Sequence, residues 1–351
     1  MKKIILIIIT CFLMVGCSNF EKHSIHAEIS EVFMDRDAAV TIVSDDGFYE
    51  SGKHLNELAK KYNIKVTVAG VVDNIDPYLE EWKNIEEEGY VDLISHSFSH
   101  LKMQEGKEFE EDELQHQITD SINYYKNNFK TDQIAFIPPE NTMCSRGYEI
   151  LRDNGIVAIR QGIRGENSLK PLQGVWPGQW YRLFTFGICD NESTEWRNSL
   201  IDNAIMNKTW LIEMWHNVYK NKSEFQGYQA ITYDKAEEHL KYMSDQSSKE
   251  NIWIASLVDA TKYILERDNS TVKAFLDGDE IRIELIMDSE ILSKDIFAHC
   301  LTVKIPLPEK WLNYKKITSK DNLDVRIKEE NGVKYILIDM LPNSETVLSK
   351  K

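Results

Sequence analysis

Two histidines and two aspartates in the first third of the chain have the types and the spacing to bind a metal ion. His96 and His100 lie four residues apart, and Asp45 is followed directly by Asp46. Each pair comes just after a short apolar run, which predicts a buried strand. In α/β folds the loops that leave the C-terminal ends of strands collect ligands and chemistry. We therefore expect the four side chains to meet at one end of a sheet.

The two aspartates are predicted to have different roles. Two imidazoles and one carboxylate make a three-ligand site for a divalent metal and leave one position open. An open position is typical of catalytic metal sites, whereas structural sites are closed. The aspartate that is left over can stay ionised as a base, within reach of a water on the metal. This arrangement predicts hydrolysis.

His216 is the third feature, because it also ends a strand-like apolar run, residues 210–215. Each feature alone has a plainer explanation. An Asp-Asp-Gly sequence suits a turn with solvated acids, a pair of spaced histidines often binds nothing, and a lone histidine is often a core residue. The coincidence of all three favours a site.

The order of these motifs resembles that of the polysaccharide deacetylases of carbohydrate esterase family 4, which share a NodB-homology domain. That family has an Asp-Asp pair, then HxxxH, then Arg-Pro-Pro, then a late strand that ends in His. The resemblance covers roughly residues 36–268. It implies that Asp45 is the base, that Asp46, His96 and His100 hold the metal, and that His216 is the acid.

The chain departs from the family pattern at the Arg-Pro-Pro segment. Ile137 stands where the family has the arginine that holds the base aspartate. Arg160, at the end of the next strand-like run, is a candidate replacement. The family's oxyanion donor is a backbone N–H, which the resemblance assigns to Glu140. Asp190 and Asp259 are the candidates for the aspartate that supports the acid histidine.

The elements that must position these residues alternate between strand-like and helix-like segments from residue 37 onward. Such alternation predicts an α/β fold with helices outside a barrel or parallel sheet. The resemblance implies a distorted (β/α) barrel of about seven strands, which we assign to residues 36–268. Beyond it the apolar pattern changes to period two, with a turn signal at residues 277–279. This predicts a small antiparallel β-sandwich over residues 269–351, with a structural role favoured over carbohydrate binding.

The first 17 residues predict a targeting segment. Lys2 and Lys3 precede an apolar run over residues 4–15, which is shorter than the roughly 20 residues of a membrane span. The segment resembles a bacterial lipoprotein signal that ends at Cys17. It predicts an extracytoplasmic protein, lipid-anchored through Cys17 to a bacterial membrane in the cell envelope or at the surface; ordinary secretion is the alternative. Residues 18–35 are predicted to be a polar tether.

The formal net charge of -16 argues against nucleic acid or a polyanion as partner and fits a neutral polysaccharide. Two of the five cysteines lie in the targeting segment. The remaining three, Cys144, Cys189 and Cys300, do not make a disulfide framework.

Three tryptophans are candidates for stacking on sugar rings, whose flat faces are apolar. Trp176 and Trp180 lie in a turn-rich stretch, and Trp215 is adjacent to His216. Packing in the core is the alternative for each of them.

The function predicted from the sequence is a metal-dependent deacetylase that removes acetyl groups from a polysaccharide or oligosaccharide. Zinc is the expected metal, because the ligands are nitrogen and oxygen. The sequence leaves open whether the acetyl group is an ester or an amide. A catalytically weak or inactive carbohydrate-binding lipoprotein is the competing hypothesis, motivated by Ile137. A zinc peptidase is ranked last, because the HExxH motif is absent.

Overall fold

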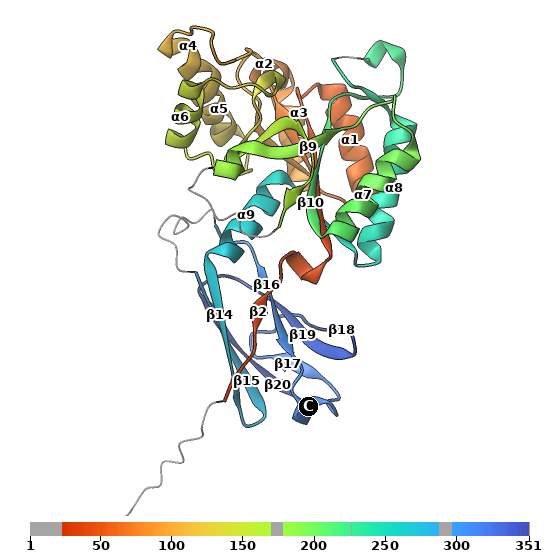
Figure 1. Cartoon of the computed structure of the whole chain (residues 1–351). Coiled ribbons are helices and arrows are strands. Elements are labelled where there is room, and N and C mark those ends of the chain that lie inside the picture. The colour runs from red at the N-terminus through yellow and green to blue at the C-terminus, as the bar shows by residue number, and fades with distance from the viewer. Residues whose placement is uncertain (1–22, 170–177, 226, 288–296, 351) are drawn as a thin grey trace, which may run out of the picture.

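The computed structural model describes residues 23–169, 178–225, 227–287 and 297–350. Figure 1 shows two lobes, one with strands surrounded by helices and one built from strands alone. The first lobe holds the residues up to α9, and the second holds the later strands together with the short strands near residue 23.

Seven parallel strands form the main sheet of the first lobe, in the order β5-β4-β3-β10-β9-β7-β6. Their bounds are Ala38–Ser44 for β3, Val66–Gly70 for β4, Val91–Ser95 for β5, Ala135–Phe136 for β6, Ala158–Arg164 for β7, Leu183–Gly187 for β9 and Thr209–Trp215 for β10. Two short strands add to it: β13 (Ile252–Ile254) pairs with β3, and β8 (Asn167–Ser168) pairs with β10.

The sheet closes on itself between its two edge strands, β5 and β6. The backbone N–H of Ile137 donates to the carbonyl of Ser95 at 3.4 Å. The Gln133 amide fills the rest of the gap, since its Nε2 donates to the Leu93 carbonyl and its Oε1 accepts from the Ser95 N–H. A side chain thus replaces a backbone partner at the seam. The predicted (β/α) barrel of about seven strands is confirmed.

The helices lie outside this barrel (Figure 1). Their bounds are Tyr49–Tyr62 for α1, Val72–Ile75 for α2, Leu79–Glu87 for α3, Glu111–Gln115 for α4, Ser121–Asn128 for α5, Ser145–Asp153 for α6, Thr194–Asn207 for α7, Tyr233–Ser248 for α8 and Leu257–Asp268 for α9. A π-helical turn, His116–Asp120, joins α4 to α5. Apolar side chains at helical spacing, such as Leu55, Leu58 and Ala59 of α1, pack against the outer face of the strands.

The second lobe is an antiparallel sandwich, as the period-two pattern predicted. One sheet has the order β1-β14-β15-β20-β17 and the other β18-β19-β16-β2. The bounds are His23–Ile25 for β1, Glu28–Ile29 for β2, Ser270–Asp277 for β14, Glu280–Met287 for β15, Leu301–Pro306 for β16, Ile317–Ser319 for β17, Val325–Glu330 for β18, Val333–Met340 for β19 and Ser344–Lys350 for β20. In β15 the buried residues alternate with partly exposed ones, so one face of the strand packs on the core.

The predicted tether over residues 18–35 needs a correction where the structure describes it. Residues 23–25 pair with β14 and residues 28–29 pair with β16, so this stretch contributes an edge strand to each sheet. It ends in a 3-10 turn, Phe33–Asp35, that leads into β3. A short polar stretch can satisfy its backbone groups on an exposed sheet edge as well as in water.

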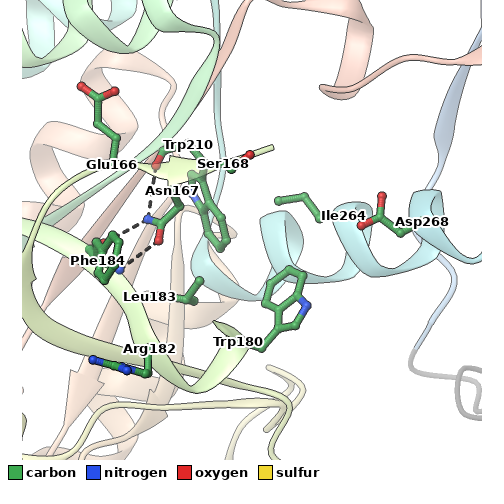
Figure 2. Close-up of a pocket in the computed structure, with 10 residues that line it drawn as sticks. All are labelled: Glu166, Asn167, Ser168, Trp180, Arg182, Leu183, Phe184, Trp210, Ile264 and Asp268. Atoms are coloured by element: carbon green, nitrogen blue, oxygen red, sulfur yellow. Dashed lines mark hydrogen bonds between the residues drawn. The ribbon is translucent and has the colours of Figure 1, made fainter. Parts of the chain in front are cut away.

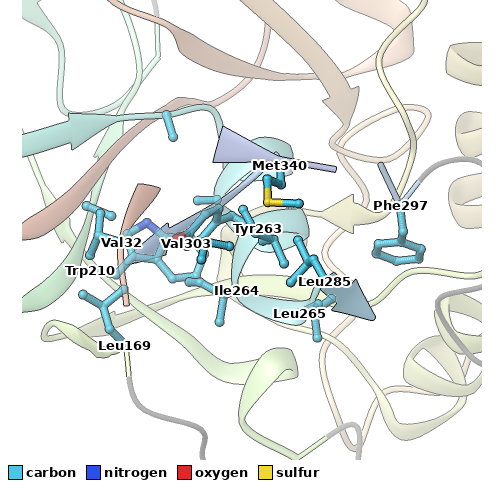
Figure 3. Packing of buried hydrophobic residues seen from close by; sticks show 14 of the residues in the cluster. Val32, Leu169, Trp210, Tyr263, Ile264, Leu265, Leu285, Phe297, Val303 and Met340 are labelled. Atoms are coloured by element: carbon cyan, nitrogen blue, oxygen red, sulfur yellow. The ribbon is translucent and has the colours of Figure 1, made fainter. Parts of the chain in front are cut away.

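Helix α9 joins the two lobes, because its side chains belong to a core that both share. Tyr263, Ile264 and Leu265 pack in one cluster with Trp210 of the barrel and Val303 of the sandwich (Figure 3). The Tyr263 hydroxyl donates to the Ser30 carbonyl at 2.7 Å, which satisfies its buried polar atom. The lower end of the barrel, where the strands begin, is therefore fixed on the sandwich.

Within the described ranges, no helix combines the length and the apolar character that crossing a bilayer requires.

Candidate active site

Asp45 and Asp46 leave the C-terminal end of β3 in a tight turn. The Asp45 N–H donates to the Trp215 carbonyl of the neighbouring strand β10, which holds the turn on the sheet. Asp46 has a φ of 74° and Gly47 a φ of 73°. A Cβ at Gly47 would lie 2.8 Å from the Gly70 Cα, so only glycine fits this close approach.

His96 and His100 leave the end of β5 in a similarly strained loop. Ser97 and His100 both have positive φ, 71° and 61°, and the Ser97 hydroxyl accepts a hydrogen bond from the His100 N–H. Backbone conformations that side chains disfavour are often kept where function requires them. Here they turn both rings toward Asp46.

Asp46, His96 and His100 come together as the sequence predicts. The Asp46 Oδ1 lies 3.7 Å from the His96 Nε2 and 3.4 Å from the His100 Nε2. One ligand atom from each of the three lies within 4.8 Å of the others, the only such group of three or more among the described residues. This spacing and this donor set fit a divalent cation with an open coordination position.

The orientation of His96 supports the same interpretation. Its Nδ1 must carry the proton, because it lies 2.7 Å from the Ile137 carbonyl, which can only accept. That leaves the Nε2 lone pair directed at the cluster, an outer hydrogen bond typical of metal-ligating histidines. Burial lowers the pKa of His96, which favours the neutral form that binds metals. The side chain of His100 is 38% exposed, so the cluster is open to solvent on its side.

Asp45 pairs with Arg160 instead of with an arginine at the family position. The Arg160 Nη2 donates to the Asp45 Oδ2 at 2.6 Å, and the two side chains are only 0% and 4% exposed. The guanidinium reaches the site from β7, while Ile137 is buried in the apolar core. The candidate replacement for the missing arginine is thus in contact with the predicted base.

His216 follows β10 and lies beside the same carboxylate. Its Nε2 is 4.0 Å from the Asp45 Oδ2, and its carbonyl accepts hydrogen bonds from the hydroxyls of Ser44 and Ser51. Within the described ranges, the Asp45 Oδ1, the His216 Nδ1 and the Nε and Nη1 of Arg160 are buried without a partner. Buried polar atoms are rarely left so, and their concentration here indicates a place for water or substrate.

The two aspartates proposed to support His216 do not contact it, which corrects that prediction. Asp190 accepts hydrogen bonds from the Tyr219 hydroxyl and the Thr232 N–H. Asp259 lies at the start of α9, where it pairs with Lys65 at 2.9 Å. Asp190 thus holds a loop near His216, and Asp259 lies at the lower end of the barrel.

Glu140 lies in a 3-10 turn, Pro139–Asn141, directly after β6. Its φ is 50°, and its side chain pairs with Lys102 at 2.6 Å. The hydrogen bond from Lys102 lowers the pKa of the Glu140 carboxyl. The side chain is thus engaged with Lys102, and its assignment as an oxyanion donor concerns the backbone N–H alone.

Two of the three predicted tryptophan platforms, Trp180 and Trp215, are not brought to the cluster. Trp215 is 0% exposed and packs against the outer helices, because alternate residues of a strand face opposite sides. Trp180 lines a cavity of about 430 Å³ together with Trp210 and Leu183 (Figure 2). Leu183 and Trp210 lie near the N-terminal ends of their strands, and the stretch from Trp210 to His216 spans roughly 20 Å of strand. Trp176 lies outside the described residues.

Sequence reasoning missed the loop that follows His216, residues 220–230. Its Gly227 lies beside Asp46 and its Tyr228 beside His216. No sequence pattern gives its position over the site.

Residues 35–159 match the family model described as polysaccharide deacetylase. No curated protein matches. Among solved structures, the Xyl-CE4 domain of a multidomain xylanase from the hindgut metagenome of Trinervitermes trinervoides is 16% identical, with a TM-score of 0.43, over 64% of this chain and 90% of that one.

Two further solved structures are similar over the same share of this chain. A peptidoglycan N-acetylglucosamine deacetylase is 14% identical with a TM-score of 0.44, covering 64% of this chain and 87% of its own. A CE4 family pseudoenzyme from Bacillus anthracis is 14% identical with a TM-score of 0.42, covering 64% and 65%.

Proposed function

Because residues 35–159 match the family model of the polysaccharide deacetylases, we propose that the protein hydrolyses acetyl groups from a polysaccharide or oligosaccharide. The observation that carries this proposal is the buried Asp45–Arg160 pair, which lies between the Asp46, His96 and His100 cluster and His216. The residues proposed as base, acid and cation ligands thus lie within one mouth of the barrel.

Asp46, His96 and His100 would hold a divalent cation, for which we propose zinc because of the nitrogen and oxygen ligands. When bound, such a cation would polarise the acetyl carbonyl and make an attacking water more acidic. The cluster contributes pre-positioned ligand atoms, since the strained loops and the His96–Ile137 hydrogen bond fix them before any ligand arrives.

Asp45 would take one proton from the attacking water, whose oxygen bonds to the acetyl carbon. Arg160 holds the carboxylate in position and compensates its buried charge. The Glu140 N–H would donate to the oxyanion. His216 would give a proton to the departing sugar oxygen or nitrogen as the bond to carbon breaks. The products are acetate and a free hydroxyl or amine.

A catalytically weak carbohydrate-binding protein is the second candidate, and Ile137 is the observation that favours it. The family arginine is absent at this position, and the Ile137 side chain is buried. The position of Arg160 weakens this alternative, because the base retains a guanidinium partner at 2.6 Å.

The test is acetate release by the full chain in detergent from acetylated xylan, chitin oligosaccharides and peptidoglycan. We expect release that a chelator stops and zinc restores. The panel also separates ester from amide substrates. Asp45→Asn should abolish turnover while zinc still binds, because the ligand set is untouched. Undiminished acetate release by Asp45→Asn would contradict the assignment of Asp45 as the base. No release by the wild type would favour the alternative of a carbohydrate-binding protein.

We also propose that the protein is extracytoplasmic and anchored to a bacterial membrane by a lipid on Cys17. The basic start, the apolar run and Gly16-Cys17 support this proposal. His23 pairs with Leu276 near the outer end of the sandwich, and Figure 1 shows this end opposite the barrel. An anchor there would direct the site away from the membrane. Cys17→Ser should move the protein from the detergent phase to the aqueous phase, and unchanged partition would contradict lipidation.

A further inference from the structure

The loop over residues 220–225 and 227–230, which we call the mouth loop, is closed at its base. Strands β11 (Val218–Tyr219) and β12 (Ile231–Thr232) flank it and pair with each other. The Asp190 carboxylate joins them, since it accepts from the Tyr219 hydroxyl at 2.7 Å and from the Thr232 N–H at 2.9 Å. The two ends of the mouth loop are therefore fixed together.

Glu224 fastens the first half of the mouth loop to helix α1. Its Oε2 accepts hydrogen bonds from the Lys220 N–H at 2.8 Å and from the His54 Nε2 at 3.0 Å. Hydrogen bonds from Asn221, Lys220 and His54 lower the pKa of Glu224 to about 2. The carboxylate therefore stays ionised, and its contacts persist, at any ordinary pH.

Gly227, in the second half of the mouth loop, lies directly beside the site. A Cβ on Gly227 would lie 3.3 Å from the Asp46 Oδ2 and 3.1 Å from the Phe48 ring. Its φ is 71°, and Gln229 on the other side of Tyr228 has a φ of 51°. Tyr228 thus projects from a tight turn whose two flanking residues are both left-handed.

Tyr228 is 70% exposed although the loop that carries it is held by the Asp190 and Glu224 hydrogen bonds. Its ring meets the His216 ring edge to face, with centroids 5.9 Å apart and planes at 84°. Phe225, three residues earlier, is 53% exposed and packs its ring against Tyr219 at 5.4 Å. Two aromatic side chains of the mouth loop thus lie uncovered, and Tyr228 is the one beside the predicted acid.

We propose that Tyr228 and Phe225 form a stacking platform that binds two neighbouring units of the sugar chain proposed above as the substrate. This inference rests on the proposed deacetylase function. Tyr228 stacks on the sugar that carries the acetyl group at His216, and Phe225 contacts the next unit. A fixed aromatic ring loses little conformational entropy on binding, which makes it an effective contact.

The contact with His216 distinguishes Tyr228 from other exposed aromatic residues. Tyr78 stacks on Tyr49 with centroids 4.6 Å apart, so one of its faces is occupied. Phe184 lines the cavity of Figure 2 at the opposite end of the barrel. Phe184 is therefore a matched control, since it is a partly exposed aromatic residue far from the site.

The experiment measures kcat and KM for acetate release by the full chain from acetylated oligosaccharides of one to six units. We expect Tyr228→Ala to raise KM about tenfold on chains of two units or more, with kcat changed less than twofold. Tyr228→Phe should behave like the wild type, because the face and not the hydroxyl is used. In the wild type, KM should be lower for chains of two units than for one unit. Phe225→Ala should remove this difference, and Phe184→Ala should leave kcat and KM unchanged.

Three results would overturn the platform. They are an unchanged KM in Tyr228→Ala, an equal loss in Phe184→Ala, and a loss confined to kcat. If the wild type releases no acetate, calorimetric binding of the same oligosaccharides tests the platform separately from the reaction. Binding that Tyr228→Ala abolishes would support it without hydrolysis, and no binding by the wild type would refute it.

Discussion

The two ends of the barrel use the same unusual backbone conformation for different purposes. At the lower end, Asn63 and Lys208 have positive φ because they cap the C-termini of α1 and α7, an ordinary use of left-handed residues. At the upper end the left-handed residues cap no helix. They are Asp46, Ser97, His100, Glu140, Asn141 and Gln229. Met34 and Asp35, in the turn that leads into β3, are also left-handed without ending a helix. Such strained residues are therefore more numerous where the candidate site lies, although they are not confined to it.

Polar atoms show the same contrast. At the upper end, buried atoms of Asp45, Arg160 and His216 lack partners among the described residues. At the lower end charges are matched: Lys65 pairs with two aspartates, and Lys304 pairs with Asp35 at 3.1 Å and with Glu330. Buried polar atoms without a described partner also occur near the lower end, such as the Ser30 Oγ and the Thr261 Oγ1. The contrast therefore lies in the charged groups: these lysine pairs at the lower end are matched, whereas the Asp45–Arg160 pair at the upper end keeps atoms without a partner. Changes at the two ends should therefore differ in what they cost.

Arg160→Met tests the upper end most severely. It leaves the Asp45 charge buried and unpaired, so we expect the free energy of unfolding to fall by about 3–5 kcal/mol. Activity should fall by about a hundredfold or more, because the base loses its orientation. Urea unfolding and acetate release measure the two effects.

The double variant Asp45→Asn with Arg160→Met separates the two effects. Removing both charges should recover most of the lost stability, since no uncompensated carboxylate remains. Activity should stay abolished. If Arg160→Met unfolds like the wild type and keeps its activity, the Asp45–Arg160 pair contributes neither to stability nor to catalysis. The proposed contrast between the two ends of the barrel would then be wrong.

Glu266→Gln tests the lower end, where burial raises the pKa of a carboxyl to about 7. Both of its oxygens accept from the His299 N–H at 3.0 Å, across the junction with the sandwich. The folded state binds this proton more tightly than the unfolded state, so stability is lost as the pH rises from about 4.5 to 7. Glu266→Gln should remove about 1–2 kcal/mol of that loss and leave activity unchanged.

Unfolding free energies at pH 5 and pH 8 measure the effect, with Glu329→Gln as the control because that side chain is exposed. We expect Glu266→Gln, and not Glu329→Gln, to have a higher free energy of unfolding than the wild type at pH 8 but not at pH 5. The same dependence of the unfolding free energy on pH in both variants would show that the junction does not titrate. Lost activity in Glu266→Gln would show that the two ends of the barrel are coupled.

Local patterns predicted the parts of the site that depend on neighbours in sequence. Asp45, Asp46, His96, His100 and His216 were identified because each follows a strand, and parallel strands bring their C-terminal ends together. The sandwich was predicted because alternation with period two is a property of single strands. Positions that depend on distant packing were harder to predict.

Trp215 and Arg160 show why the rest could not be read from the sequence. Trp215 is adjacent to His216 in sequence, yet strand alternation directs it outward to the helices. Arg160 reaches Asp45 from a strand 115 residues away in sequence, and only the closed barrel brings the two together. Ile137, in turn, is packed in the shared apolar core, so returning an arginine to that position would bury a charge there.

Comparing Glu140→Gly at the upper end with Lys208→Gly at the lower end should give the smallest effects. It tests whether the left-handed residues at the two ends differ in their importance for activity. Each replaces a strained residue, for which a left-handed backbone costs roughly 1 kcal/mol, by glycine. Lys208→Gly should gain about 0.5–1 kcal/mol of stability with activity unchanged, because it only caps a helix. Glu140→Gly should gain less, about 0.5 kcal/mol, since it also loses the pair with Lys102. Its activity should fall severalfold, because a looser turn no longer fixes the N–H at that position. If Glu140→Gly gains stability and keeps full activity, then the strain at the upper end is as incidental to function as that of a helix cap.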